Sequence, residues 1–133
     1  MRLLDSSAWI EYLRDTGGRA AEEVARLLAD PEDLATTEPL VMELLAGAVD
    51  DRALRSLETL TSGLVVLPVD PAVDFHDAAA IHRAARRRGV TVRRLNDCLI
   101  AAIALRHDVR LVHRDHDFEV IAAVSPLKTQ SLI

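Results

Sequence analysis

The chain opens with the stretch RLLDSSAWI at residues 2–10, in which a short apolar run passes into a helical pattern through a single aspartate. Residues 2–5 are predicted to form a strand, and Ser6 or Ser7 can cap the helix that follows. Asp5 therefore falls at the carboxyl end of a strand. Ligands of open α/β sheets bind in the crevice beyond these ends. The stretch thus indicates both a fold class and a candidate site.

Short apolar runs alternate with helical periodicity along the rest of the chain, a pattern typical of an α/β domain with a mainly parallel sheet. The sheet is predicted to have four to five strands. Further strands are expected at 34–36, 64–67 and 110–113, with a last one near 127–129. No linker, repeat or low-complexity tract divides the 133 residues, so a single domain over residues 1–133 is predicted.

The composition narrows the classes of protein to which the chain can belong. Cys98 is the only cysteine, which excludes an intrachain disulfide and a zinc knuckle and favours a reducing compartment, so we expect a cytoplasmic protein. No stretch approaches a signal peptide or a membrane span, and no membrane partner is expected. The net charge of −5 argues against a surface that binds phosphate throughout.

Four acidic residues lie either at the ends of predicted strands or within predicted apolar helices. Asp5 and Asp115 follow predicted strands, and Glu43 is the only charged residue at 41–45. Asp97 opens the most hydrophobic helix, which is predicted to run to about His107 with Asn96 as its cap. Each has an ordinary explanation when taken alone. Glu43 can reach solvent or an arginine, and an acid in a first helical turn stabilises the helix dipole by about 0.3–1 kcal/mol.

Taken together, the four acids predict a metal site. Carboxylates gathered in one cleft repel one another unless a cation neutralises them. Ligation by oxygen alone favours Mg²⁺, with Mn²⁺ as a substitute, because Zn²⁺ normally recruits histidine or cysteine. The five histidines show no zinc-binding spacing.

These features resemble the PIN domain, and in particular the VapC-type toxins of bacterial toxin–antitoxin pairs. The resemblance covers essentially the whole chain and rests on the order and spacing of the acids. The matching motifs are Asp5-Ser6-Ser7-Ala8 after a strand, Glu43 in an apolar helix, Asn96-Asp97 at a helix start, and HRDHDF at 113–118.

The resemblance implies a three-layer α/β/α sandwich and a Mg²⁺-dependent endoribonuclease. The expected substrate is a structured cellular RNA of the tRNA or rRNA class, cut to leave 5′-phosphate and 3′-hydroxyl ends. The resemblance also implies a homodimer, a hetero-oligomer with a cognate VapB-type antitoxin, and inhibition by that antitoxin.

Carried over residue by residue, the resemblance assigns catalysis and metal binding to four acids and adds Asp117 as a further ligand that some members use. Ser7 matches the supporting hydroxyl beside the first acid. His113 departs from the pattern, because many relatives have Thr or Ser there. The four acids are Asp5, Glu43, Asp97 and Asp115.

A local cluster of arginines is the candidate for contacts with the RNA backbone, since arginine suits bidentate phosphate binding. The ordinary alternative is a solvated helix end that favours the dipole. Aromatic residues are too few for a base-stacking platform, so recognition is expected to rely on RNA shape. The candidate arginines are Arg86, Arg87, Arg88, Arg93 and Arg94.

Two other functions remain open at this point. A phosphoacceptor receiver-like domain would use Asp70 as acceptor and Lys128 near the last strand, but it leaves Glu43 and Asp97 unexplained. A non-catalytic RNA-binding module of PIN type would bind without cleaving. The intact set of four acids speaks against that module.

Overall fold

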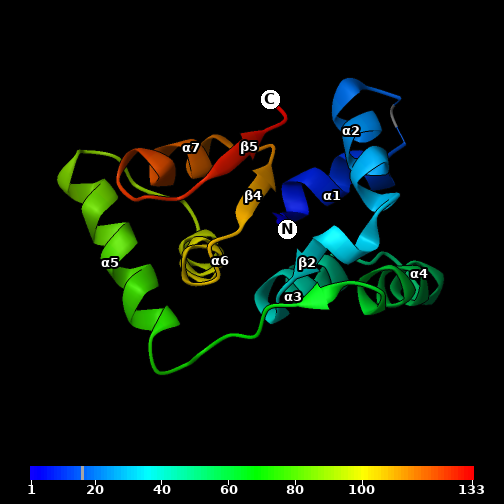
Figure 1. Cartoon of the computed structure of the whole chain (residues 1–133), viewed down its shortest axis with the longest axis horizontal. Helices are drawn as coiled ribbons and strands as arrows, with labels where there is room; N and C mark the ends of the chain where they lie inside the picture. The colour runs from blue at the N-terminus through cyan, green and yellow to red at the C-terminus, as the bar shows by residue number, and fades with distance from the viewer. Residues whose placement is uncertain (16) are drawn as a thin grey trace.

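A sheet of five parallel strands runs through the centre of the molecule (Figure 1). The computed structural model describes residues 1–15 and 17–133. The strand order is β3-β2-β1-β4-β5, and each neighbouring pair is parallel. The prediction of a mainly parallel sheet of four to five strands is confirmed. The strands are β1 (Arg2–Leu4), β2 (Leu34–Thr36), β3 (Val65–Val66), β4 (Arg110–His113) and β5 (Thr129–Ser131).

Helices cover both faces of this sheet, which confirms the predicted three-layer sandwich. Side chains alternate along a strand, so neighbouring residues of β1 enter different cores. Leu3 packs in the core that α5, α6 and α7 complete, and Leu4 packs in the core of α1, α2 and α4. The helices are α1 (Ser6–Leu13), α2 (Arg19–Leu28), the short 3₁₀ helix η1 (Pro31–Asp33), α3 (Glu38–Ala46), α4 (Asp51–Ser62), α5 (Asp74–Arg87), α6 (Leu95–Arg106) and α7 (His116–Ala123).

Helix α6 is the central helix of the larger core. Every residue from Asp97 to Ala104 is buried, as expected for a helix that is apolar all round. The helix begins at Leu95, with Arg94 at the N-cap position. Our prediction that Asn96 caps this helix is wrong, because Asn96 lies within the first turn and its side chain reaches α3.

The sheet edge differs from expectation at two strands. Residues 64–67 were predicted as a buried strand, but only Val65 and Val66 pair, and they are 39% and 52% exposed because β3 is an edge strand. β5 begins at Thr129, at the end of the range expected for the last strand. Within the residues described, no helix is both long enough and apolar enough to cross a membrane.

Candidate active site

The carboxyl edge of the sheet gathers acids from distant parts of the sequence. β1 and β4 are neighbours, with Leu4 opposite Val112, so Asp5 and Asp115 emerge at the same edge. Helix α6 contributes Asp97 and α7 contributes Asp117. One carboxylate oxygen from each of Asp97, Asp115 and Asp117 lies within 4.8 Å of the others. These three residues and Asp5 are called the acid cluster below.

Two members of the acid cluster are almost completely removed from solvent. Asp5 is 2% exposed and Asp97 is 1% exposed. Asp5 Oδ2 accepts hydrogen bonds from the backbone N–H and the hydroxyl of Ser7. In contrast, Asp5 Oδ1 and Asp97 Oδ2 are buried without a hydrogen-bond partner among the described residues. Buried polar atoms without partners are costly, so both oxygens are placed to accept an external cation.

The pKa values of both carboxyls are raised, because nearby donors and positive charges do not offset the effect of burial. Burial raises the pKa of Asp97 to about 7, and the charges of Asp5, Glu43 and Asp115 add to this rise while Arg94 opposes it. Burial also raises the pKa of Asp5, against the opposing effect of the Ser7 hydrogen bonds. A cation bound between the carboxylates would favour their ionised forms.

Glu43 stands beside the acid cluster and is held by two neutral donors. Its Oε2 accepts a hydrogen bond from the Ser6 hydroxyl at 2.7 Å, and its Oε1 accepts one from the side-chain amide of Asn96 at 2.5 Å. Its charge contributes to the raised pKa of Asp97, which places it near the cluster. It is not among the three acids whose oxygens lie within 4.8 Å.

Ser7 ties the ends of β1 and β4 together. Its hydroxyl donates to Asp5 Oδ2 and accepts a hydrogen bond from the backbone N–H of Arg114 at 2.9 Å. This geometry supports the role that the sequence resemblance gave to Ser7. The interaction spans 107 residues of sequence, so a change in the serine affects both strand ends.

His113 orients Asp115 from within the core. The buried ring accepts a hydrogen bond at Nδ1 from the backbone N–H of Asp115, at 3.1 Å. Because Nδ1 accepts, Nε2 carries the proton and donates to Glu119 at 2.8 Å. The ring therefore provides a polar contact at the position where the resemblance led us to expect Thr or Ser. Sequence reasoning missed this role, as it did the roles of Ser6 and Asn96; the only signal was their position next to the acids.

Two of the five predicted RNA-binding arginines fold onto the acid cluster instead of pointing into solvent. Arg93 reaches Asp115 Oδ1 through Nη2 and Asp117 Oδ2 through Nε, each at 3.0 Å. Arg94 reaches Asp115 Oδ2 at 3.1 Å and lies 3.5 Å from Asp97 Oδ2. The other three follow one another at the end of α5, and within residues 1–15 and 17–133 they form no ion pair. They are Arg86, Arg87 and Arg88.

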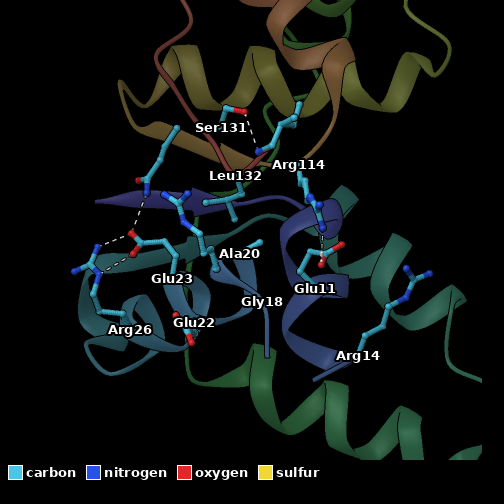
Figure 2. Close-up of a pocket in the computed structure, with 13 residues that line it drawn as sticks. Glu11, Arg14, Gly18, Ala20, Glu22, Glu23, Arg26, Arg114, Ser131 and Leu132 are labelled. Carbon is cyan, nitrogen blue, oxygen red and sulfur yellow. Dashed lines mark hydrogen bonds and ion pairs between the residues drawn. The ribbon is translucent and has the colours of Figure 1, made fainter. Parts of the chain in front are cut away.

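A separate cavity of about 1060 Å³ is lined by residues of α1, α2 and the end of β5 (Figure 2). Figure 2 shows Arg114 directed to Glu11, with which it forms an ion pair at 2.7 Å. In the same view Glu23 accepts hydrogen bonds from Arg26. Glu23 also accepts one from the side-chain amide of Gln130 at 2.9 Å. None of the clustered acids lines this cavity. Glu11 and Glu23 of this cavity pair with arginines. The buried carboxylate oxygens that accept no hydrogen bond from the described residues, Asp5 Oδ1 and Asp97 Oδ2, lie in the acid cluster.

The PIN domain family model matches residues 2–124 of this sequence. The chain belongs to the PIN domain family. Within that family it is similar to proteins named as VapC ribonucleases. It is 55% identical over 132 residues to Ribonuclease VapC11 of Mycobacterium tuberculosis, covering 98% of each chain. The same values hold for VapC ribonuclease Mb1587 of Mycobacterium bovis.

Solved structures of VapBC proteins contain chains that share the fold of this chain. The DNA-bound VapBC complex of Salmonella typhimurium contains a chain that matches with a TM-score of 0.79 and 21% identity, covering 98% of this chain and 96% of that one. VapBC-1 of nontypeable Haemophilus influenzae matches with a TM-score of 0.72 and 24% identity, covering 98% and 96%. The family resemblance inferred from the sequence is thus confirmed, and the receiver-like alternative is set aside.

Proposed function

We propose that this PIN domain chain is a divalent-metal-dependent endoribonuclease and the toxin of a VapBC-type pair. The observation that carries the proposal is the presence of two buried carboxylate oxygens, Asp5 Oδ1 and Asp97 Oδ2, that accept no hydrogen bond from the described residues and lie beside Asp115 and Asp117. Membership of the VapC group supports ribonuclease activity. The acids Asp5, Asp97, Asp115 and Asp117 would hold the metal, with Glu43 at its margin.

The chemistry of the available donors favours Mg²⁺ or Mn²⁺. Cys98 follows Asp97 in α6, but burial raises the pKa of its thiol to about 11, so a thiolate is not available as a ligand. His113 is adjacent to the cluster, but both ring nitrogens are occupied by Asp115 and Glu119. Carboxylate oxygens remain, and these suit hard cations.

The residues around the metal site have distinct tasks in hydrolysis. A bound divalent ion supplies activation of water and stabilisation of the leaving oxygen. Ser7 fixes the orientation of Asp5, and Ser6 with Asn96 fixes that of Glu43. Glu43, held beside the cluster, would accept a proton from the attacking water. The ribose 2′-hydroxyl takes no part, so the products carry 5′-phosphate and 3′-hydroxyl ends.

The proposal extends to substrate and partners. We expect a structured RNA of the tRNA or rRNA class; one structural neighbour, VapC20 of Mycobacterium tuberculosis, is described as a Sarcin-Ricin loop cleaving toxin. Several neighbours are VapBC toxin–antitoxin complexes, which supports a VapB-type antitoxin as inhibitor. A homodimer, a hetero-oligomer with the antitoxin and a cytoplasmic location complete the proposal.

Cleavage of total cellular RNA by the purified, antitoxin-free chain tests this function. Reactions contain Mg²⁺ or EDTA, and Asp97→Asn protein purified in the same way reveals contaminating nuclease. We expect discrete fragments from the wild-type chain with Mg²⁺ alone, with 5′-phosphate ends. RNA binding without cleavage by folded protein would favour the non-catalytic module, and 2′,3′-cyclic phosphate products would contradict the mechanism.

A further inference from the structure

We propose that Arg93 and Arg94 bind the substrate RNA, and that the acid cluster holds their side chains until a divalent cation binds. Their guanidinium groups neutralise the carboxylates in the metal-free protein, leave them when a divalent cation binds, and then contact phosphates of the RNA at the site of cleavage. This inference rests on the proposed function, because it requires a metal at the acid cluster.

The arginines and a cation compete for the same oxygen atoms. Asp115 receives Arg93 on Oδ1 and Arg94 on Oδ2, so both of its oxygens are engaged. Asp117 Oδ2 also receives Arg93, and Arg94 Nε lies 3.5 Å from Asp97 Oδ2. A divalent ion binds carboxylate oxygens at about 2.0–2.1 Å in the case of Mg²⁺. A cation bound to Asp115 and Asp117 therefore competes with the two guanidiniums for the same oxygens and repels their positive charge.

The exposure of the two arginines allows them to move without disturbing the core. Their side chains are 69% and 57% exposed, and both reach the cluster from solvent. The contrast is Arg106, whose bidentate pair with the fully buried Asp74 is reinforced by a hydrogen bond to the carbonyl of Pro68. Arg106 has a structural role. Among the residues that the structure describes, the side-chain hydrogen bonds and ion pairs of Arg93 and Arg94 all go to acids of the cluster.

After release, the two guanidiniums remain close to the metal. The backbone N–H of Arg93 donates to Asp117 Oδ2 at 3.3 Å, and Arg94 is the N-cap residue of α6, two positions before Asn96. The main chain thus keeps both residues at the cluster when their side chains swing away. A phosphate that reaches the metal lies within their range, and arginine binds phosphate in a bidentate manner.

Binding of Mn²⁺ by the purified chain tests the first half of this inference. Calorimetry at pH 8 compares wild type with Arg93→Gln, Arg94→Gln and the double variant, and with Arg52→Gln on exposed α4 as the matched control. Each single change is expected to tighten Mn²⁺ binding by about two- to five-fold, the scale of an exposed ion pair. Arg94→Lys keeps the positive charge but loses the planar guanidinium, so its Mn²⁺ affinity should lie between those of wild type and Arg94→Gln. This variant also shows whether the effect of Arg94→Gln comes from misfolding.

Binding of bulk tRNA tests the second half. Fluorescence anisotropy is measured in EDTA and in Ca²⁺, and the RNA is checked on a gel for intactness. The Gln variants should weaken tRNA binding in Ca²⁺ more than in EDTA, because only the metal frees the wild-type arginines. In Ca²⁺ each variant should also lower the slope of log affinity against log salt by about 0.7–0.9.

The outcomes separate this inference from the proposed function. If wild type binds Mn²⁺ and Asp97→Asn does not, the metal site at the acid cluster is supported. Unchanged or weaker Mn²⁺ binding by the arginine variants would then overturn only the proposal that the cation displaces Arg93 and Arg94. An equal loss of tRNA affinity in EDTA and Ca²⁺ overturns the transfer to phosphate. If wild type binds no Mn²⁺, the proposed function and this inference both fail.

Discussion

The side-chain amide of Asn96 donates a hydrogen bond to Glu43 Oε1 at 2.5 Å and joins α6 to α3 across 53 residues of sequence. The same amide lies 3.4 Å from the carbonyl oxygen of Pro39. Asn96 thus fixes the orientation of an acid that Ser6 holds from the other side. A residue that looks like a helix cap in the sequence is a positioning residue for Glu43.

Replacement of Asn96 by alanine should lower RNA cleavage about 10- to 100-fold, as removal of an orienting partner typically does. The free energy of unfolding should fall by only about 1 kcal/mol, the usual value of one hydrogen bond. Single-turnover cleavage and urea denaturation measure the two effects. Thr59→Ala, which removes a hydroxyl contact on exposed α4, is the control. Full activity of Asn96→Ala would show that Glu43 needs no support.

Replacement of Ser7 by alanine should affect both Asp5 and the backbone of Arg114. It removes a donor from Asp5 Oδ2 and leaves the Arg114 N–H without its acceptor, at a cost of roughly 1–3 kcal/mol. We expect lower Mn²⁺ affinity and a lower melting temperature. Calorimetry and thermal denaturation test this against Ser56→Ala on the outer face of α4. Metal affinity equal to that of wild type would contradict the role of Ser7.

Replacement of Asp97 by asparagine should abolish cleavage yet stabilise the metal-free fold at neutral and alkaline pH. The pKa of Asp97 is about 7 in the folded chain, above the ordinary value of 3.8. As the pH rises from about 4 to 7, the unfolded chain releases this proton and the folded chain does not, so the folded state loses stability. The loss is complete above pH 7.

Urea denaturation of wild type and Asp97→Asn in EDTA, at pH 4 and pH 8, measures this effect. The difference between the two proteins should be small at pH 4 and reach the order of a few kcal/mol at pH 8, since one pKa unit corresponds to about 1.4 kcal/mol. Addition of Mg²⁺ should raise the melting temperature of wild type alone. A less stable Asp97→Asn protein at pH 8 would contradict the raised pKa.

Metal binding should strengthen as the pH rises through about 7. Burial raises the pKa of Asp97 to about 7 and also raises the pKa of Asp5, and a carboxyl must lose its proton to act as a ligand. Below this range a bound cation must displace a proton. Mn²⁺ titrations between pH 5.5 and 8.5 measure the dependence. The same affinity across this range would show that the acids are already ionised in the metal-free chain.

Replacement of Arg106 by methionine should destabilise the fold without altering the acid cluster. Burial alone would raise the pKa of Asp74, but the hydrogen bonds from Arg106, the backbone hydrogen bond from Asp70 and the charge of Arg106 together hold that pKa below its usual value. Loss of one partner of a buried pair costs roughly 3–5 kcal/mol. In wild type, the stability from Asp74 is present above about pH 4 and is lost as the pH falls through the lowered pKa.

Urea denaturation at pH 7 measures the destabilisation of Arg106→Met, and Mn²⁺ affinity at a temperature where the variant is folded serves as the control. The combined change Asp74→Leu and Arg106→Met should recover much of the loss, because no buried charge remains unpaired. A single variant as stable as wild type would show that this pair contributes little.

Several features of the protein were predictable from local sequence patterns. Short apolar runs located most strands to within a few residues, and their alternation with helical periodicity indicated a mainly parallel sheet. Parallel strands bring their carboxyl ends to one edge, so the convergence of Asp5 and Asp115 followed from the order of elements alone. Glu43 and Asp97 stood out as acids in apolar helices, and the family resemblance assigned them to the same site.

Other features depend on which side chains meet when the layers pack. An apolar run does not say whether a strand is central or at an edge, so the exposure of Val65 and Val66 came from the strand order. The sequence by itself determined which acids reach the edge of the sheet. Only the tertiary structure decided that Asn96 orients Glu43 and that Arg93 and Arg94 cover the cluster, because rotamers and distances between remote residues depend on packing and not on spacing along the chain.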